Sequence, residues 1–89
     1  MKIAFDIGGV LSKYPGEFRV LIAALAQSPL VDVRAITDQT DRDYTLQRLK
    51  DNGFDIPPDR VHNADYAQCG GMCKAVVVNA HGIDVIIDR

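Results

Sequence analysis

Four polar side chains lie at or near the ends of apolar segments that have the character of buried strands. Asp6, Thr37 and Asp88 each end such a segment, and Lys74 lies on the helix that we expect before the last one. In an open α/β sheet, ligands bind outside the carboxyl ends of the strands. Two carboxylates, a hydroxyl and an ammonium group that converge there would form a site for a metal ion and a phosphate group.

Each of these residues has a definite role in such a site. Asp6 is the candidate nucleophile, because a carboxylate can attack phosphorus and form an aspartyl-phosphate. Asp6 and Asp88 can ligate Mg²⁺, which usually takes one or two carboxylates together with waters and substrate oxygens. Thr37 can donate a hydrogen bond to a phosphoryl oxygen. Lys74 can neutralise phosphate charge near the beginning of a helix and orient Asp6.

Two glycines follow Asp6 in the sequence. Gly9 allows the backbone to approach a ligand closely, so we expect it to contribute to phosphate binding. The carbonyl of Gly8 can serve as a further metal ligand beside Asp6 and Asp88. Gly8 has no side chain that could act as a general acid, a contribution typically worth about 10²–10⁴-fold. It could also hold a backbone conformation that a larger residue tolerates poorly.

Ordinary structural roles compete with these interpretations. Asp6 could cap a turn, Thr37 is a common strand-end residue, and Lys74 could be a solvated surface side chain. We expect the acidic residues after the second strand to cap a helix rather than to join the site; they are Asp38, Asp41 and Asp43.

The remaining candidate ligands give little indication of a site. Cys69 and Cys73 are predicted to be free thiols, because their spacing is not that of a usual metal-ligand pair. His62 and His81 are predicted to be separate surface residues.

The apolar pattern predicts strands that alternate with helices, which is typical of a parallel sheet. The first and last strands are fully apolar, so we expect both to be buried on both faces. The segment 75–78 is β-branched and could be a strand, but Gly82 then ends a helix well. We therefore expect strands over 2–6, 31–37, 60–64 and 83–88, and helices over 16–27, 41–52 and 71–81.

The order of the site residues resembles that of the haloacid dehalogenase (HAD) superfamily. Its four motifs are matched in order by Asp6-Ile7-Gly8-Gly9-Val10-Leu11, Ile36-Thr37-Asp38, Lys74 and Val85-Ile86-Ile87-Asp88. The resemblance implies a three-layer α/β/α sandwich, a HAD-like Rossmannoid with a parallel sheet of strand order 4-1-2-3. It also implies a Mg²⁺-dependent phosphohydrolase in which Asp6, Thr37 and Lys74 are catalytic.

The chain departs from the family pattern in several places. Many HAD phosphatases carry an Asp where Gly8 stands, and Arg89 occupies a position where the family often has a second acid. The usual fifth strand is missing, so the fourth strand would have an open edge that a homodimer could cover. No segment is long enough for a cap domain. We therefore expect residues 1–89 to form a single capless core, open to a phosphorylated substrate as large as a macromolecule.

Two other hypotheses remain open at this point. The chain could be a HAD-like binding or interaction domain without catalysis, or a fragment of a longer HAD hydrolase. Its 89 residues have a formal net charge of −2, which gives no electrostatic reason to bind nucleic acid or an anionic membrane. No apolar segment approaches the ~20 residues of a membrane span, and no signal peptide is evident, so we expect a cytoplasmic protein.

Overall fold

Strands and helices alternate along the chain in a computed structural model that describes residues 1–64 and 73–88. No helix within these ranges is long and apolar enough to cross a membrane. The elements are β1 (Lys2–Asp6), η1 (Ile7–Leu11), α1 (Pro15–Ala26), β2 (Asp32–Thr37), α2 (Arg42–Asp51), η2 (Pro58–Arg60), β3 (Val61–Asn63), α4 (Cys73–His81) and β4 (Val85–Ile87).

β1 and β2 are the internal strands of a four-stranded sheet in which every pairing is parallel. The strand order is β3-β2-β1-β4, which reads 4-1-2-3 from the opposite edge. The register pairs Phe5 with Ala35 on one side and with Ile87 on the other. Because the strands run in the same direction, their carboxyl ends lie at one edge of the sheet. The predicted α/β class with a parallel sheet is confirmed.

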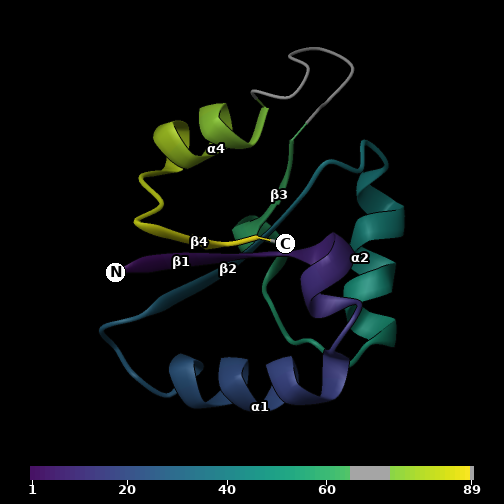
Figure 1. Cartoon of the computed structure of the whole chain (residues 1–89), viewed down its shortest axis with the longest axis vertical. Coiled ribbons are helices and arrows are strands. Elements are labelled where there is room, and N and C mark those ends of the chain that lie inside the picture. Colours follow the sequence, from purple (N-terminus) through teal and green to yellow (C-terminus); the bar gives the residue numbers. More distant parts are fainter. Residues whose placement is uncertain (65–72, 89) are drawn as a thin grey trace.

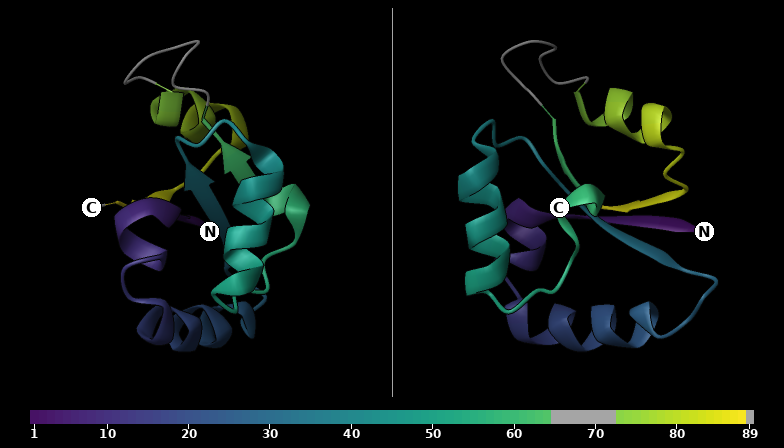
Figure 2. Two further views of the ribbon diagram at one scale, coloured as in Figure 1. Left: turned by 90° about the vertical axis from the view of Figure 1, so that its right-hand side faces the viewer. Right: turned by 180° about the vertical axis from the view of Figure 1, so that it is seen from behind.

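Helices cover both faces of the sheet (Figures 1 and 2). Side chains alternate between the two faces along each strand, so β1 contributes Phe5 to one face and Ala4 to the other. α4 packs over the smaller apolar cluster, which consists of Ala4, Ile36 and Ile83. α1 and α2 pack over the larger cluster, which consists of Phe5, Ile7, Leu11, Ile22, Val33, Ala35, Leu49, Phe54 and Val61.

Local sequence explains where the two helices of the larger layer begin. Pro15 occupies the first turn of α1, where its missing N–H costs nothing. Phe18 on α1 packs edge-on against Phe5 with ring centroids 5.8 Å apart. The side chain of Asp41 accepts a hydrogen bond of 3.0 Å from the N–H of Tyr44 and so caps α2. The predicted bounds of both helices agree with the observed ones to within one residue.

The side of the sheet covered by α4 decides two predictions, one on the segment 75–78 and one on the burial of the fourth strand. The segment 75–78 is helical, and Val77 and Val78 pack against the smaller cluster. The expectation that the fourth strand is buried on both faces is wrong, because Val85 is 37% exposed and Ile87 is 36% exposed. β4 is an edge strand that pairs only with β1, and the apolar cluster on the α4 side of the sheet is small. Of the predicted helix 71–81, residues 71 and 72 lie outside the described ranges.

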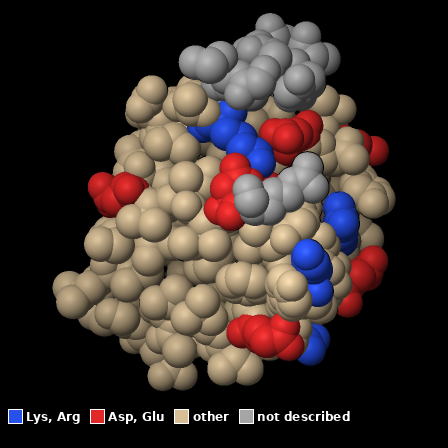
Figure 3. Space-filling view, in the orientation of Figure 1, with Lys and Arg blue, Asp and Glu red and all other residues tan. Residues whose placement is uncertain are grey.

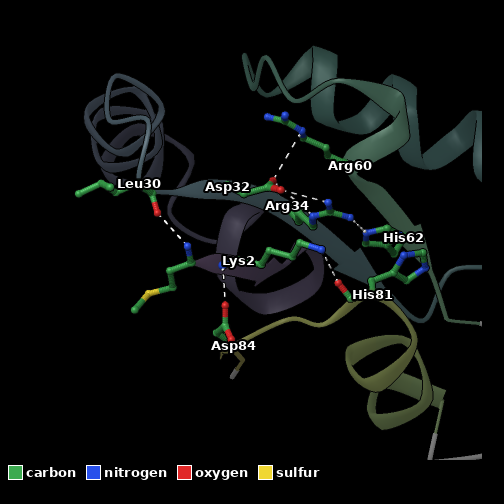
Figure 4. A network of polar contacts seen from close by, with 9 residues as sticks. Lys2, Leu30, Asp32, Arg34, Arg60, His62, His81 and Asp84 are labelled. Atoms are coloured by element: carbon green, nitrogen blue, oxygen red, sulfur yellow. Dashed lines mark hydrogen bonds and ion pairs between the residues drawn. The ribbon is translucent and has the colours of Figure 1, made fainter.

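A polar network lies beside α4, on the face of the sheet that α4 covers (Figure 4). The rings of His62 and His81 stack with centroids 4.0 Å apart. Arg34 Nη1 lies 3.1 Å from His62 Nε2 and must donate to it, since a guanidinium has no acceptor. Lys2 Nζ donates a 2.8 Å hydrogen bond to the carbonyl of His81. The two histidines are therefore not separate, because the middle of β3 meets the end of α4. The expectation of a surface position is wrong for His62, which is buried, whereas His81 is exposed as expected.

The buried His62 makes folding stability depend on pH. Burial, and the charges of His81, Arg34 and Arg42, lower its pKa from 6.5 to about 4. The unfolded chain therefore binds more protons than the folded chain between these values, so stability falls as the pH falls through this window. We expect the wild type to lose about 1–2 kcal/mol more than His62→Gln between pH 7 and pH 5, measured by urea unfolding. Equal losses in both proteins would contradict the assignment.

Candidate functional site

Lys74 is the centre of a charged cluster at the carboxyl edge of the sheet. Its Nζ lies 3.1 Å from Asp6 Oδ1, 3.3 Å from Asp88 Oδ1 and 4.0 Å from Asp38 Oδ1. Asp6 is the last residue of β1, while Asp38 and Asp88 directly follow β2 and β4. Because β2 and β4 flank β1, their ends bring the three carboxylates together. The second residue of α4 then places the ammonium group among them.

The geometry therefore brings together three residues that the sequence suggested for the site: Asp6, Lys74 and Asp88. It also adds Asp38, for which we expected a capping role. That expectation is wrong for Asp38, because Asp41 caps α2 and Asp38 reaches toward Lys74 instead. Its place directly after a parallel strand was the signal that could have identified it.

Burial controls the electrostatics of Asp6 and Lys74. Asp6 is only 3% exposed, and this burial raises its pKa; the neighbouring Asp88 adds to the effect, while Lys74 opposes it. Burial acts to lower the pKa of Lys74. The hydrogen bond and charge of Asp6, with the charges of Asp38 and Asp88, outweigh that effect, so the pKa of Lys74 lies above its usual value. Both groups thus titrate away from their ordinary ranges because they share one partly buried site.

The cluster has an excess of negative charge. Three carboxylates surround one ammonium group, so the sum is −2 when all four are ionised. Acidic and basic side chains lie side by side in one patch on the face seen in Figure 3. Such an arrangement attracts a cation more readily than a second anion. No group of three His, Cys, Asp or Glu side chains arranged to hold a metal occurs within residues 1–64 and 73–88.

Thr37 ends β2 and is 7% exposed. Its Oγ1 accepts a 3.2 Å hydrogen bond from the N–H of Gln39, which leaves the hydroxyl hydrogen available to a ligand. Asn63 holds the same loop by donating a 2.6 Å hydrogen bond to the carbonyl of Gln39. Further along, Gln39 Oε1 accepts from the N–H groups of Thr40 and Asp41. This loop is therefore fixed by its own polar contacts beside the charged cluster.

The two glycines after Asp6 have different backbone conformations. Gly9 has φ 84°, which favours glycine, whereas Gly8 has φ −74° and ψ 120°, which any residue can adopt. No atom lies within 4 Å of the position that a Cβ on Gly8 would take. The idea that a side chain at Gly8 would be poorly tolerated is thus wrong. The N–H of Gly9 donates a 3.3 Å hydrogen bond to Ser12 Oγ, which fixes this turn.

An open cleft of about 550 Å³ lies beside the charged cluster and is lined by Asp6, Asp38 and Lys74 but not by Asp88. Its size is within the ~300–1,000 Å³ usual for small-molecule sites. Arg48 was not predicted from the sequence, because its place in the lining depends on how α2 is rotated. The lining residues are Asp6, Gly8, Gly9, Thr37, Asp38, Gln39, Thr40, Arg48 and Lys74.

Some predictions fall on parts of the chain that the structure does not describe. Cys69 and Arg89 lie outside the described residues, as does the side chain of Cys73. The free thiols and the effect of Arg89 on the site therefore stay predictions. The homodimer also stays a prediction.

Comparison with known proteins adds no family assignment. No family model, no curated protein and no solved structure gives a significant match to the chain. The functional argument therefore rests on the residues of the cleft and on their geometry.

The two glycines offer a matched test of the turn that follows Asp6. We expect Gly8→Ala to leave the free energy of unfolding unchanged or to raise it by up to about 1 kcal/mol, since its backbone suits alanine. Gly9→Ala should lower it by about 1–2 kcal/mol, because its positive φ strains any residue with a Cβ. Urea unfolding of both variants beside the wild type measures the difference. A larger loss in Gly8→Ala than in Gly9→Ala would contradict this geometry.

Proposed function

We propose that this chain is a HAD-like, Mg²⁺-dependent phosphohydrolase that acts through an aspartyl-phosphate on Asp6. The observation that carries the proposal is the pairing of a buried carboxylate with a lysine at the carboxyl edge of a parallel sheet. Lys74 Nζ lies 3.1 Å from Asp6 and 3.3 Å from Asp88. The order of the strands and helices is compatible with a HAD-like Rossmannoid core.

The chemistry would take two steps. Asp6 Oδ attacks phosphorus, a new P–O bond forms, and the bond to the leaving oxygen breaks. Water then attacks the same phosphorus and releases phosphate together with the free carboxylate. Asp6 must attack as a carboxylate, and burial raises its pKa in the metal-free site, so its charged form would depend on Lys74 and on the bound Mg²⁺.

Lys74 and Thr37 have supporting roles in this proposal. The hydrogen bond from Lys74 orients Asp6 and favours its charged form against the cost of burial. Thr37 lines the same cleft and can donate its hydroxyl hydrogen to a phosphoryl oxygen. Both roles depend on a phosphate group that lies in the cleft near the end of β1.

The donor set suits Mg²⁺, a hard cation that binds oxygen. The excess negative charge around Lys74 favours a cation, and the carboxylates of Asp6 and Asp88 would hold it with the carbonyl of Gly8. Bound Mg²⁺ would offset the repulsion between the nucleophile and the phosphate. Asp38 lies beside the cluster, where it would add to the same attraction.

The absence of an acidic side chain at Gly8 limits which phosphate esters the protein would hydrolyse efficiently. The leaving oxygen would take its proton from solvent, so good leaving groups should react faster than poor ones. The cleft is open and excludes water poorly, which weakens electrostatic catalysis. An open cleft also suits a bulky phosphorylated substrate better than a small one.

A binding domain without catalysis is the second candidate. The observation in its favour is that Lys74 is already paired with two carboxylates, so less of its charge is available to a phosphate. Gly8 supports it as well, because no side chain there can act as an acid. Activity measurements separate the two candidates.

The nucleophile can be tested by substitution. We expect slow, Mg²⁺-dependent hydrolysis of an aryl phosphate by the wild type and no turnover above background in Asp6→Asn, because the amide cannot form the intermediate. Lys50→Gln, an exposed change on α2 outside the cleft, is the control and should keep wild-type turnover. Wild-type rates in Asp6→Asn would rule out the aspartyl-phosphate route, and an inactive wild type would favour the binding domain.

Gly8→Asp tests the missing acid, and no atom lies within 4 Å of the position that its Cβ would take. We expect this variant to speed alkyl phosphates more than aryl phosphates, by up to about 10²–10⁴-fold, because an acid helps poor leaving groups most. The ratio of the two rates, measured in the folded variant, is the informative quantity. An equal effect on both esters would show that the new carboxyl group does not donate a proton to the leaving oxygen.

The metal site can be tested without turnover. Isothermal calorimetry should show weak Mg²⁺ binding to the wild type and none to Asp88→Asn, which loses one of the two carboxylate ligands. Asp59→Asn is a matched control, because it removes the same charge from an exposed residue of η2 outside the cleft. If Asp88→Asn bound Mg²⁺ as well as the wild type, the metal would lie elsewhere.

A further inference from the structure

Arg48 differs from the other arginines that the structure describes. Its guanidinium makes no hydrogen bond and no ion pair with any residue of 1–64 or 73–88. The guanidinium groups of the other four all have partners. Those of Arg19, Arg34 and Arg42 donate hydrogen bonds, and that of Arg60 forms an ion pair with Asp32. Arg48 is nevertheless half-buried and lines the cleft.

The helix that carries Arg48 is held firmly in place. Thr45 and Leu49 are buried against the rest of the fold, and Asp41 caps the beginning of α2. At the same end, Arg42 Nη1 donates a 2.9 Å hydrogen bond to the carbonyl of Val61 on β3. The rotation of α2 is thereby fixed. Arg48 is thus presented to the cleft by a rigid element rather than by a loop.

The charge distribution of the cleft shows what Arg48 can bind. The carboxylates around Lys74 occupy its ammonium group, and their excess charge repels an anion at that end wherever no bound cation offsets it, so the reacting phosphate would depend there on Mg²⁺. Within the described chain, Arg48 is the other cation in the lining. A guanidinium presents its N–H donors in a planar fork that matches carboxylate and phosphate oxygens. A cleft of about 550 Å³ has room for more than the phosphoryl group that reacts.

We propose that Arg48 binds a second anionic group, a carboxylate or a phosphate, on the substrate. The substrate class would then be a phosphate ester that carries a second oxyanion, with the reacting phosphate near Asp6 and the other anion at Arg48. This inference rests on the proposed function, because it places a phosphate ester in the same cleft. It goes further by assigning a specificity-determining residue to α2.

The test measures binding with ligands that cannot be hydrolysed. Propylphosphonate carries one anionic group, while 3-phosphonopropanoate and propane-1,3-bisphosphonate add a carboxylate or a second phosphonate. Dissociation constants come from NMR titrations with a fixed excess of Mg²⁺. We expect the wild type to bind at least one doubly anionic ligand about 10-fold more tightly than propylphosphonate, in line with a charge-assisted contact.

Substitutions on α2 assign that preference to Arg48. Arg48→Gln should lower the affinity for the preferred doubly anionic ligand at least several-fold more than the affinity for propylphosphonate, and Arg48→Lys should keep part of the preference. Lys50→Gln is the control, because it removes the same charge from an exposed position of the same helix outside the cleft. It should keep the wild-type preference. The ligand that gains most identifies the second group as carboxylate or phosphate.

Two results would overturn the inference. One is a wild type that binds all three ligands equally, and the other is an Arg48→Gln variant that weakens all three by the same factor. The binding measurement is independent of turnover. A preference that depends on Arg48 in a protein without phosphatase activity would refute only the proposed hydrolysis. Hydrolysis of aryl phosphates without any such preference would refute only the role of Arg48.

Discussion

The buried pair of Asp6 and Lys74 is the interaction on which the rest of this site depends. A carboxylate that is 3% exposed is costly to keep ionised without a partner, and Lys74 lies 3.1 Å away to provide one. The pair joins the end of an internal strand to the first turn of α4. It therefore ties the helix of the smaller layer to the centre of the sheet. The remaining charges, from Asp38 and Asp88, are arranged around this pair.

Such a pair adds little net stability, because both groups lose solvation, but removing either partner alone typically costs about 3–5 kcal/mol. Under the proposed function, the pair would keep Asp6 available as a carboxylate, and the excess of acids around Lys74 would favour a bound cation. A phosphate would then interact with that cation, with Thr37 and with the partly neutralised Lys74. Arg48 is the other cation that lines this cleft, and its guanidinium has no ion-pair partner among residues 1–64 and 73–88.

The two faces of the sheet contribute unequally to the site. α1 and α2 pack over the large apolar cluster, and that layer positions Arg48. The face beneath α4 has a small apolar cluster and a polar network around His62 and His81 (Figure 4). Lys74 and Asp88 belong to the side with the smaller apolar cluster, where β4 is a partly exposed edge strand. The half of the site on α2 is therefore held by more apolar packing than the half on α4 and β4.

The alternation of strands and helices, and the meeting of Asp6, Lys74 and Asp88, could be predicted from the amino-acid sequence. Apolar segments identify parallel strands, and the ends of such strands share one edge. The HAD-like assignment and the hydrolysis remain predictions from the motifs. Three outcomes could not be predicted in this way: Asp38 joins the cluster, Arg48 lines the cleft, and His62 stacks on His81. Those outcomes depend on helix rotation and on which elements become neighbours, and both are set by packing between segments far apart in the chain.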